Sequence, residues 1–316
     1  MIKEIAFRKI LVTTLALLTI GIIYFFPNNK DIKFKEIINY YEEDNLKSVY
    51  LLDKYNYVSK LKVPIYETDI LEMIKEKINY LIINSESKDK IPNGFRGIIP
   101  IDTKILDIKI DNNILIINFS KEFLNTNKDD EEHMIEALIF TVTEFENIKG
   151  IKVNVEGKRL IEFPISKKKI PELLDRTFGI NKVYDFNSLN NLNQTIVYYV
   201  NKIDDKTYYT PVTKINNDSR DKVTLVIEEL KSNIIYQSNL SSYLSEAAVL
   251  DKYEMEGDKI ILSFNDKIFD TSSKNILEEV EYTISMSLMD NLGVKEVVFR
   301  VNNEKNDVSV IKTLEN

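Results

Sequence analysis

The stretch ILDIKIDNNILIINF, residues 105–119, decides the fold because it occurs twice, returning as LDKYEMEGDKIILSF at residues 250–264. Each copy alternates apolar and polar residues, turns at a polar triplet, and continues as an apolar run that closes on a phenylalanine. Alternation of period two on both sides of a polar turn is typical of a β-hairpin. The chain therefore carries the same predicted hairpin in two places.

The repetition extends beyond the hairpin in both directions. The apolar start at 49–52 returns at 197–200, and a helix-like pattern running into a strand at 131–155 returns at 275–301. Three matches in the same order, at nearly constant spacing, indicate a tandem duplication. The length of 316 residues also suits about two domains. Because duplicated modules without catalytic residues usually build surfaces, the duplication favours a role in binding.

Each copy is predicted to run strand, strand, helix, hairpin, helix, strand. Asp69 precedes an apolar-periodic stretch and is expected to cap the first helix of the first copy, and the corresponding helix of the second copy is predicted at 221–230. The second helix begins in the acid-rich turn at 129–132 and ends before Gly150 in the first copy, and spans 272–292 in the second. Since two helices per copy must cover a sheet, the predicted class is α+β, with two tandem two-layer modules. The predicted strands are 48–53, 57–65, 104–110, 114–118 and 151–155, then 195–200, 208–212, 249–255, 259–263 and 296–301.

The first residues of the chain predict a membrane anchor. Residues 10–26 are uncharged and stop at Pro27, which is about the shortest length that spans a bilayer. Lys3, Arg8 and Lys9 precede the run, so its amino end is expected to stay cytoplasmic and the rest of the chain to lie outside. The run lacks the small residues of a signal-peptidase site near its end. We therefore predict an uncleaved single-pass transmembrane helix, with a cleaved signal peptide as the alternative.

These segments define a predicted domain order. It comprises a cytoplasmic stub and anchor at 1–27, a tether at 28–47, the first module at 48–158, a connector at 159–194, the second module at 195–303 and a flexible tail at 304–316.

Composition leaves little room for catalysis. The absence of cysteine excludes disulfides and thiolate metal sites, and a formal net charge of −8 gives no attraction to nucleic acid. The single histidine, His133, follows a run of acids and could bind a metal or act as a base, although helix-initiating acids explain that run. Asp102, Asp107 and Asp111 could form the carboxylate pair of a glycan hydrolase, but turn acids are usually solvated. We predict no catalytic residue, no cofactor, no metal and no enzymatic activity.

The opening strands of both copies are rich in tyrosine. Tyrosine favours strand packing as well as interfaces, so two interpretations stay open, packing within the core and an exposed binding edge. The candidate interaction surface consists of Tyr50, Tyr57, Tyr198, Tyr199 and Tyr208.

Five motifs carry a resemblance to a known family. They are VYLLDKYNYVSKLKVPI (49–65), IPIDTKI (99–105), INFS (117–120), ALIFTVTEF (137–145) and LDRTFGIN (174–181). The first four resemble the GerMN domain, the module of the GerM family of sporulation and germination proteins, and the fifth is similar to the segment that joins two such modules. The resemblance weakens in the second copy, where 287–291 and 244–248 depart from the pattern. Relatives in that family are lipid-anchored through a cysteine that this chain lacks, so a transmembrane helix would place the modules in the same compartment by other means.

The resemblance implies a ring-building-like module fold and an extracytoplasmic protein of endospore formation or germination. Such a protein would lie between the mother cell and forespore membranes and belong to a spore-envelope complex. Our first hypothesis is a membrane-anchored, non-enzymatic interaction or scaffold protein. Its partners would be other spore-envelope proteins, and residues 10–26 would contact the membrane. The alternatives are a module that binds peptidoglycan or a small ligand, and a carboxylate-based cell-wall hydrolase.

Overall fold

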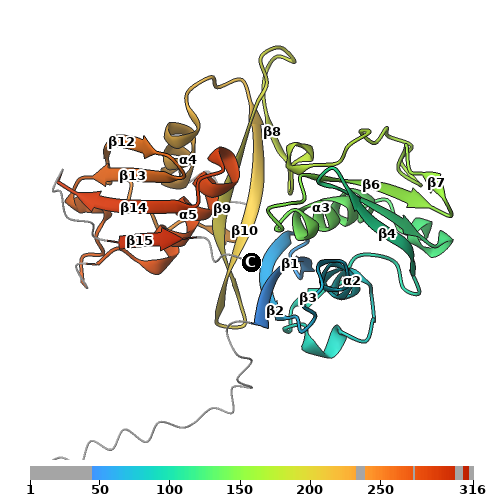
Figure 1. Ribbon diagram of the computed structural model, residues 1–316. Helices are drawn as coiled ribbons and strands as arrows, with labels where there is room; N and C mark the ends of the chain where they lie inside the picture. The colour runs from blue at the N-terminus through green and yellow to red at the C-terminus, as the bar shows by residue number, and fades with distance from the viewer. Residues whose placement is uncertain (1–44, 233–238, 273–274, 303–308, 313–316) are drawn as a thin grey trace, which may run out of the picture. The chain divides into compact units, whose positions relative to one another are not determined.

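The computed structural model describes residues 45–232, 239–272, 275–302 and 309–312 (Figure 1). The predicted anchor at 10–26 and residues 28–44 of the predicted tether lie outside the described residues. Of the helices that the structure describes, none combines the length and the apolar character needed to cross a membrane.

The first module contains the predicted elements in the predicted order. The side chain of Asp69 caps the first helix, accepting hydrogen bonds from the backbone N–H groups of Leu71 and Glu72 at 3.0 and 3.1 Å. The second helix ends at Val142, earlier than expected, because the following residues close two successive turns and Gly150 opens a strand. The elements are β1 (Leu46–Asp53), β2 (Val58–Pro64), α2 (Ile70–Leu81), β3 (Phe95–Arg96), β4 (Ile105–Asp111), β5 (Ile114–Phe119), α3 (Glu131–Val142), β6 (Gly150–Val155) and β7 (Lys158–Arg159).

The connector and the second module follow. Asp221, predicted as the first residue of this helix, instead caps α4 by accepting from the backbone N–H of Thr224 at 3.0 Å. The last helix begins at Glu278 and not at residue 272, because the Asp270 N–H donates to the Asn275 carbonyl and closes a loop. The elements are η4 (Arg176–Phe178), β8 (Val183–Asp185), β9 (Asn193–Ile203), β10 (Lys206–Asn216), α4 (Lys222–Lys231), β11 (Leu240–Ser241), β12 (Leu250–Glu256), β13 (Lys259–Phe264), α5 (Glu278–Leu292), β14 (Glu296–Val301) and β15 (Ser309–Lys312).

Each module has a four-stranded sheet of the same design. The strand orders are β4-β5-β6-β7 and β12-β13-β14-β15, and the middle pairs β5–β6 and β13–β14 are parallel. The last strand lies in the segment predicted as a flexible tail, so that prediction is wrong for residues 309–312. This strand pairs with the edge of β14, whose backbone N–H and C=O groups would otherwise be open.

The opening hairpins do not join the sheets of their own modules, which corrects the predicted arrangement of one sheet per module. Hairpin β1–β2 and hairpin β9–β10 instead form one shared sheet in the order β11-β9-β10-β2-β1-β3, with β8 also on β10 (Figure 1). The two hairpins meet where β2 pairs antiparallel with β10 at Lys60 and Tyr209. This single residue pair joins the edges of the two hairpins across the module boundary.

The helices lie between the shared sheet and the four-stranded sheets. Helix α3 contacts β1 and β2 on one side and β6 on the other, and α5 contacts β9 as well as β14. Every residue of α3 from Met134 to Val142 is buried, as expected of a helix covered on opposite faces. The modules are therefore layered units whose innermost layer is common to both.

Candidate functional site

The junction, meaning the contact between the two modules across the shared sheet, brings equivalent residues of the two copies together. The phenol oxygens of Tyr50 and Tyr198 lie 3.1 Å apart. Asn201 Nδ2 donates to Asp53 Oδ2 at 2.6 Å, and each of these residues directly follows the repeated opening motif. Contact between equivalent positions is typical of an approximate two-fold axis, and here it relates two halves of one chain.

Further hydrogen bonds from Tyr50 and Tyr198 tie each opening hairpin to the second helix of its module or to the residues just after that helix. The backbone N–H of Tyr50 donates to Thr141 Oγ1 at 3.0 Å, and its hydroxyl donates to Glu144 Oε1 at 2.8 Å. In the second module the backbone N–H of Tyr198 donates to a serine hydroxyl of α5 at 2.9 Å, and its phenol donates to Asp290 Oδ2 at 2.8 Å. The duplication therefore preserved a tyrosine–carboxylate pair in both copies.

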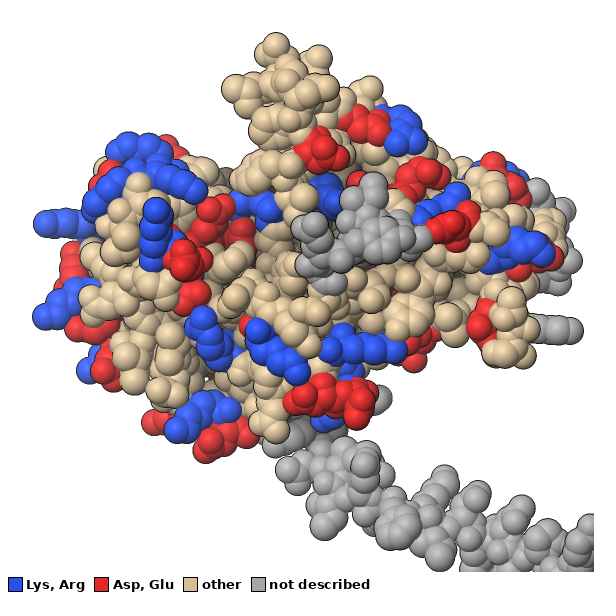
Figure 2. Space-filling view, turned by 180° about the vertical axis from the view of Figure 1, so that it is seen from behind, with Lys and Arg blue, Asp and Glu red and all other residues tan. Residues whose placement is uncertain are grey.

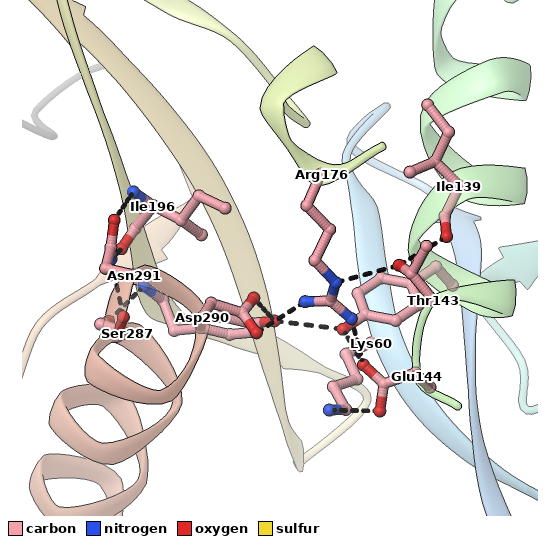
Figure 3. A network of polar contacts seen from close by, with 11 residues as sticks. Lys60, Ile139, Thr143, Glu144, Arg176, Ile196, Ser287, Asp290 and Asn291 are labelled. Carbon is pink, nitrogen blue, oxygen red and sulfur yellow. Dashed lines mark hydrogen bonds and ion pairs between the residues drawn. The ribbon is translucent and has the colours of Figure 1, made fainter. Parts of the chain in front are cut away.

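One arginine of the connector joins these two carboxylates. Arg176 lies on η4, and its Nη1 and Nη2 atoms donate to Asp290 Oδ1 at 2.6 Å and to Glu144 Oε1 at 2.7 Å (Figure 3). Its Nε donates to Thr143 Oγ1 at 3.0 Å, and the guanidinium lies 4.8 Å from the centre of the Phe140 ring. We call Arg176, Glu144 and Asp290 the Arg176 clamp. Its side chains are 23, 11 and 17 % exposed, so water screens their charges only partly.

Charge balance keeps these groups in fixed protonation states. Burial and then the charge of Glu144 raise the pKa of the Tyr50 hydroxyl well above its ordinary value, and burial with Asp290 does the same for Tyr198. Burial alone would raise the pKa of Glu144, but Lys60, at 3.0 Å, and Arg176 hold it well below its ordinary value. The phenols therefore remain donors and Glu144 an acceptor throughout the neutral range, which suits a permanent contact better than proton transfer.

A second connector residue bridges the two hairpins beside the clamp. Asn181 Oδ1 accepts from the Val58 N–H at 2.9 Å, and its Nδ2 donates to the carbonyls of Val58 and Pro211 at 2.8 and 2.7 Å. Proline has no N–H for a strand ladder, and here the asparagine amide satisfies its carbonyl. The next residue, Lys182, forms ion pairs with Glu136 at 2.7 Å and with a second glutamate of α3.

Comparison with known proteins identifies the family. Residues 48–161 and 196–307 match the model of the Germane family, described as sporulation and spore germination. The chain belongs to the Germane family. It is 33% identical over 264 residues to the spore germination protein GerM of Bacillus subtilis (strain 168), covering 81% of this chain and 71% of that protein. The solved structure of the tandem GerMN domains of the sporulation protein GerM from Bacillus subtilis matches with a TM-score of 0.75 and 31% identity, over 82% of this chain and 92% of that one.

These comparisons confirm the resemblance read from the sequence motifs. Both copies match the family model, including the second, in which fewer motifs are visible in the sequence. The α+β tandem arrangement of Germane modules is likewise confirmed. Membership of this family indicates a role in sporulation or germination.

The structure does not place the five predicted tyrosines on an exposed edge. Tyr50, Tyr198 and Tyr199 are buried, with at most 1% of their surface exposed. Tyr57 packs against the core of the second Germane module, and Tyr208 packs against Phe95 of the first, with ring centres 4.6 Å apart. Of the two interpretations left open, these three residues follow packing within the core: Tyr50 and Tyr198 meet each other between the modules, and Tyr199 packs in the core of the second module. Four of the five belong to the junction within the chain.

The other candidate residues remain dispersed. His133 Nδ1 lies 2.8 Å from a carboxylate oxygen of Glu136, and the histidine lines a cavity of about 430 Å³ at the start of α3. Asp102, Asp107 and Asp111 are exposed on a turn and on β4. Among the residues that the structure describes, no cluster of histidine and carboxylate side chains could hold a metal ion.

Sequence reasoning missed the Arg176 clamp altogether. Glu144, two residues after α3, and Asp290, in the last turn of α5, occupy equivalent places in the two copies, so aligning the copies could have drawn attention to them. Arg176 itself has no counterpart in the repeat, because it comes from the connector. Only the fold shows that one cation serves two carboxylates.

Proposed function

We propose that this chain is a membrane-anchored, extracytoplasmic scaffold of endospore formation or germination that acts by binding other spore-envelope proteins and not by catalysis. The observation that carries this proposal is the junction, in which a continuous sheet and the Arg176 clamp join both modules. Domains of one chain normally move relative to each other unless their interface is extensive. A shared sheet suppresses such motion and holds two surfaces in a fixed relation.

Rigidity favours binding because less conformational freedom is lost on association. The polar groups at the junction are also engaged with one another, so Glu144 and Asp290 are held as ion-pair partners of Arg176. A pair of carboxylates neutralised in this way is unsuited to the acid and base roles of a glycan hydrolase, which need one protonated and one free carboxyl group. The junction therefore offers a fixed contact between the modules and no hydrolase carboxylate pair.

Residues 10–26 would provide the anchor, with the modules outside the cytoplasmic membrane and, in a sporulating cell, between the two membranes. The absence of cysteine makes this topology directly testable. In intact cells that express the full chain, an impermeant maleimide should label Asp89→Cys, an exposed position of the first module. Lys3→Cys should be labelled only after lysis. Labelling of Lys3→Cys in intact cells, or release of the chain by alkaline carbonate, would contradict the anchor.

The scaffold role is tested by co-purification. The tagged full chain, expressed in a spore-forming strain without its own copy, should recover envelope proteins from membranes after cross-linking. Arg176→Met should reduce that recovery, whereas Arg220→Met, which removes an exposed pair with Asp218, should not. Equal recovery by both variants would refute the dependence on a rigid junction. Release of muropeptides from purified peptidoglycan by the wild-type chain would instead establish an enzyme.

A further inference from the structure

An exposed apolar projection lies in the connector, away from the junction. We call residues 183–192 the finger; it comprises β8 and the loop that leads to β9. Leu189 is 78% exposed and Tyr184 is 61% exposed, and Asp185 is the only charged residue of the ten. Figure 2 shows uncharged side chains on the projection at the top of the view, whereas the face below it carries many charged ones. The remaining exposed apolar side chains of the finger are Val183, Phe186 and Leu192.

Side chains of Asn217, just after β10, and of Ser188 bind backbone polar groups at the tip of the finger. Asn217 Oδ1 accepts from the N–H groups of Asn187 and Ser188 at 3.1 and 3.3 Å. Its Nδ2 donates to the carbonyls of Ser188 and Asn190, both at 2.9 Å. The Ser188 hydroxyl also accepts from the Asn190 N–H at 3.1 Å. An unsatisfied N–H or C=O group is costly in an apolar medium, so these hydrogen bonds lower the free-energy cost of moving the tip out of water.

The base of the finger is fixed to the shared sheet. Strand β8 pairs in parallel with the end of β10, and Asn193 Nδ2 donates to the Asp218 carbonyl at 2.8 Å on the returning side. The rings of Tyr184 and Phe186 pack edge to face with their centres 6.0 Å apart. The apolar side chains are thus presented on an ordered loop, so little further ordering is needed for contact.

We propose that the finger inserts into the headgroup region of a lipid bilayer with neutral headgroups. Aliphatic and aromatic side chains fringed by uncharged amides suit the membrane interface, where tyrosine is enriched. The finger has no lysine or arginine, and the chain carries a net charge of −8, so an anionic surface offers no attraction. A protein partner is less favoured because four backbone groups at the tip, the N–H groups of Asn187 and Ser188 and the carbonyls of Ser188 and Asn190, are already bound by Asn217. This contact goes beyond the anchor and the scaffold role proposed above.

The chain contains no tryptophan, so one introduced tryptophan reports on its own surroundings. Leu189→Trp places the reporter at the tip, where high exposure makes the substitution harmless to folding. The full-length variant is reconstituted into phosphatidylcholine vesicles with brominated acyl chains. Bromine should quench the emission and the spectrum should shift to the blue, independently of salt. Leu106→Trp, on β4 and 49% exposed, is the matched control and should remain unquenched.

Adding Tyr184→Asp to Leu189→Trp should lower the ratio of inserted to exposed finger about tenfold, because an aromatic side chain that favours the interface is replaced by a charge. Quenching of the tip reporter by aqueous iodide, but not by brominated lipid, would overturn the proposal and leave a protein partner as the occupant. Insertion that needs anionic lipid and disappears in salt would overturn the assignment to neutral headgroups.

Discussion

Replacing Arg176 with methionine should destabilise the folded chain by about 3 kcal/mol, at the lower end of the cost of breaking a buried ion pair because the site is partly exposed. The loss of Arg176 leaves different partners on the two carboxylates. Glu144 keeps Lys60 at 3.0 Å, whereas Asp290 keeps the Tyr198 hydroxyl at 2.8 Å. The larger loss should therefore fall on the second module.

This asymmetry provides an internal test. In the Arg176→Met background, Asp290→Asn removes the uncompensated charge and should recover about 1.5 kcal/mol. Glu144→Gln in the same background should recover less, because it also removes a partner of Lys60. Arg220→Met is the control at the surface: Arg220 is 54% exposed and pairs with Asp218, so its loss should cost less than about 1 kcal/mol.

The assay is urea unfolding followed by near-ultraviolet circular dichroism of the 17 tyrosines, with the far-ultraviolet signal as a second probe. Wild type should unfold in one transition, since the modules share a sheet, and Arg176→Met should shift the midpoint downward or separate two transitions. If Arg176→Met and Arg220→Met cost the same, or if Asp290→Asn recovers nothing, the clamp does not stabilise the junction as argued.

Three further predictions concern the first module. Lys77 is buried, and burial lowers its pKa to about 8, so Lys77→Met should stabilise the fold by up to roughly 3 kcal/mol at pH 7. Between pH 8 and 10.5 the folded state binds fewer protons than the unfolded state, so the stability of the wild type should rise with pH across that window. The stability advantage of Lys77→Met over the wild type should vanish over the same window, as urea titrations at each pH would show. Burial lowers the pKa of His133, but the hydrogen bond to Glu136 outweighs it and raises the pKa. Protonated His133 therefore stabilises the fold below pH about 6.5, and this stabilisation is lost as the pH rises through the raised pKa. His133→Gln should remove this pH dependence of the melting temperature. Gly97→Ala should cost about 1–3 kcal/mol in thermal unfolding, since its Cβ would lie 2.7 Å from the Leu81 carbonyl oxygen.

Local signals in the sequence anticipated the elements and their order. Asp69 caps the helix that it was expected to cap, since a cap depends on a few adjacent residues. The two-residue turn at Asn112 and Asn113 has positive φ at both positions, as a tight hairpin requires. Errors arose at boundaries that depend on pairing at a distance, such as strand β15 in the expected tail.

The sequence alone indicated the duplication and the class of each module, because periodicity and repeated motifs are properties of neighbouring residues, and its motifs carried the resemblance to the family that the comparisons confirmed. It could not establish which strand edges would meet. Alternation in β2 and β10 reports only which side chains face the core, and a free edge can pair with any other edge. The tertiary structure joined these two edges, and thereby decided that Tyr50 and Tyr198, for which both packing and an exposed edge had stayed open, lie inside the junction. It also brought Arg176 within reach of Glu144 and Asp290, which lie in different modules and share no local pattern.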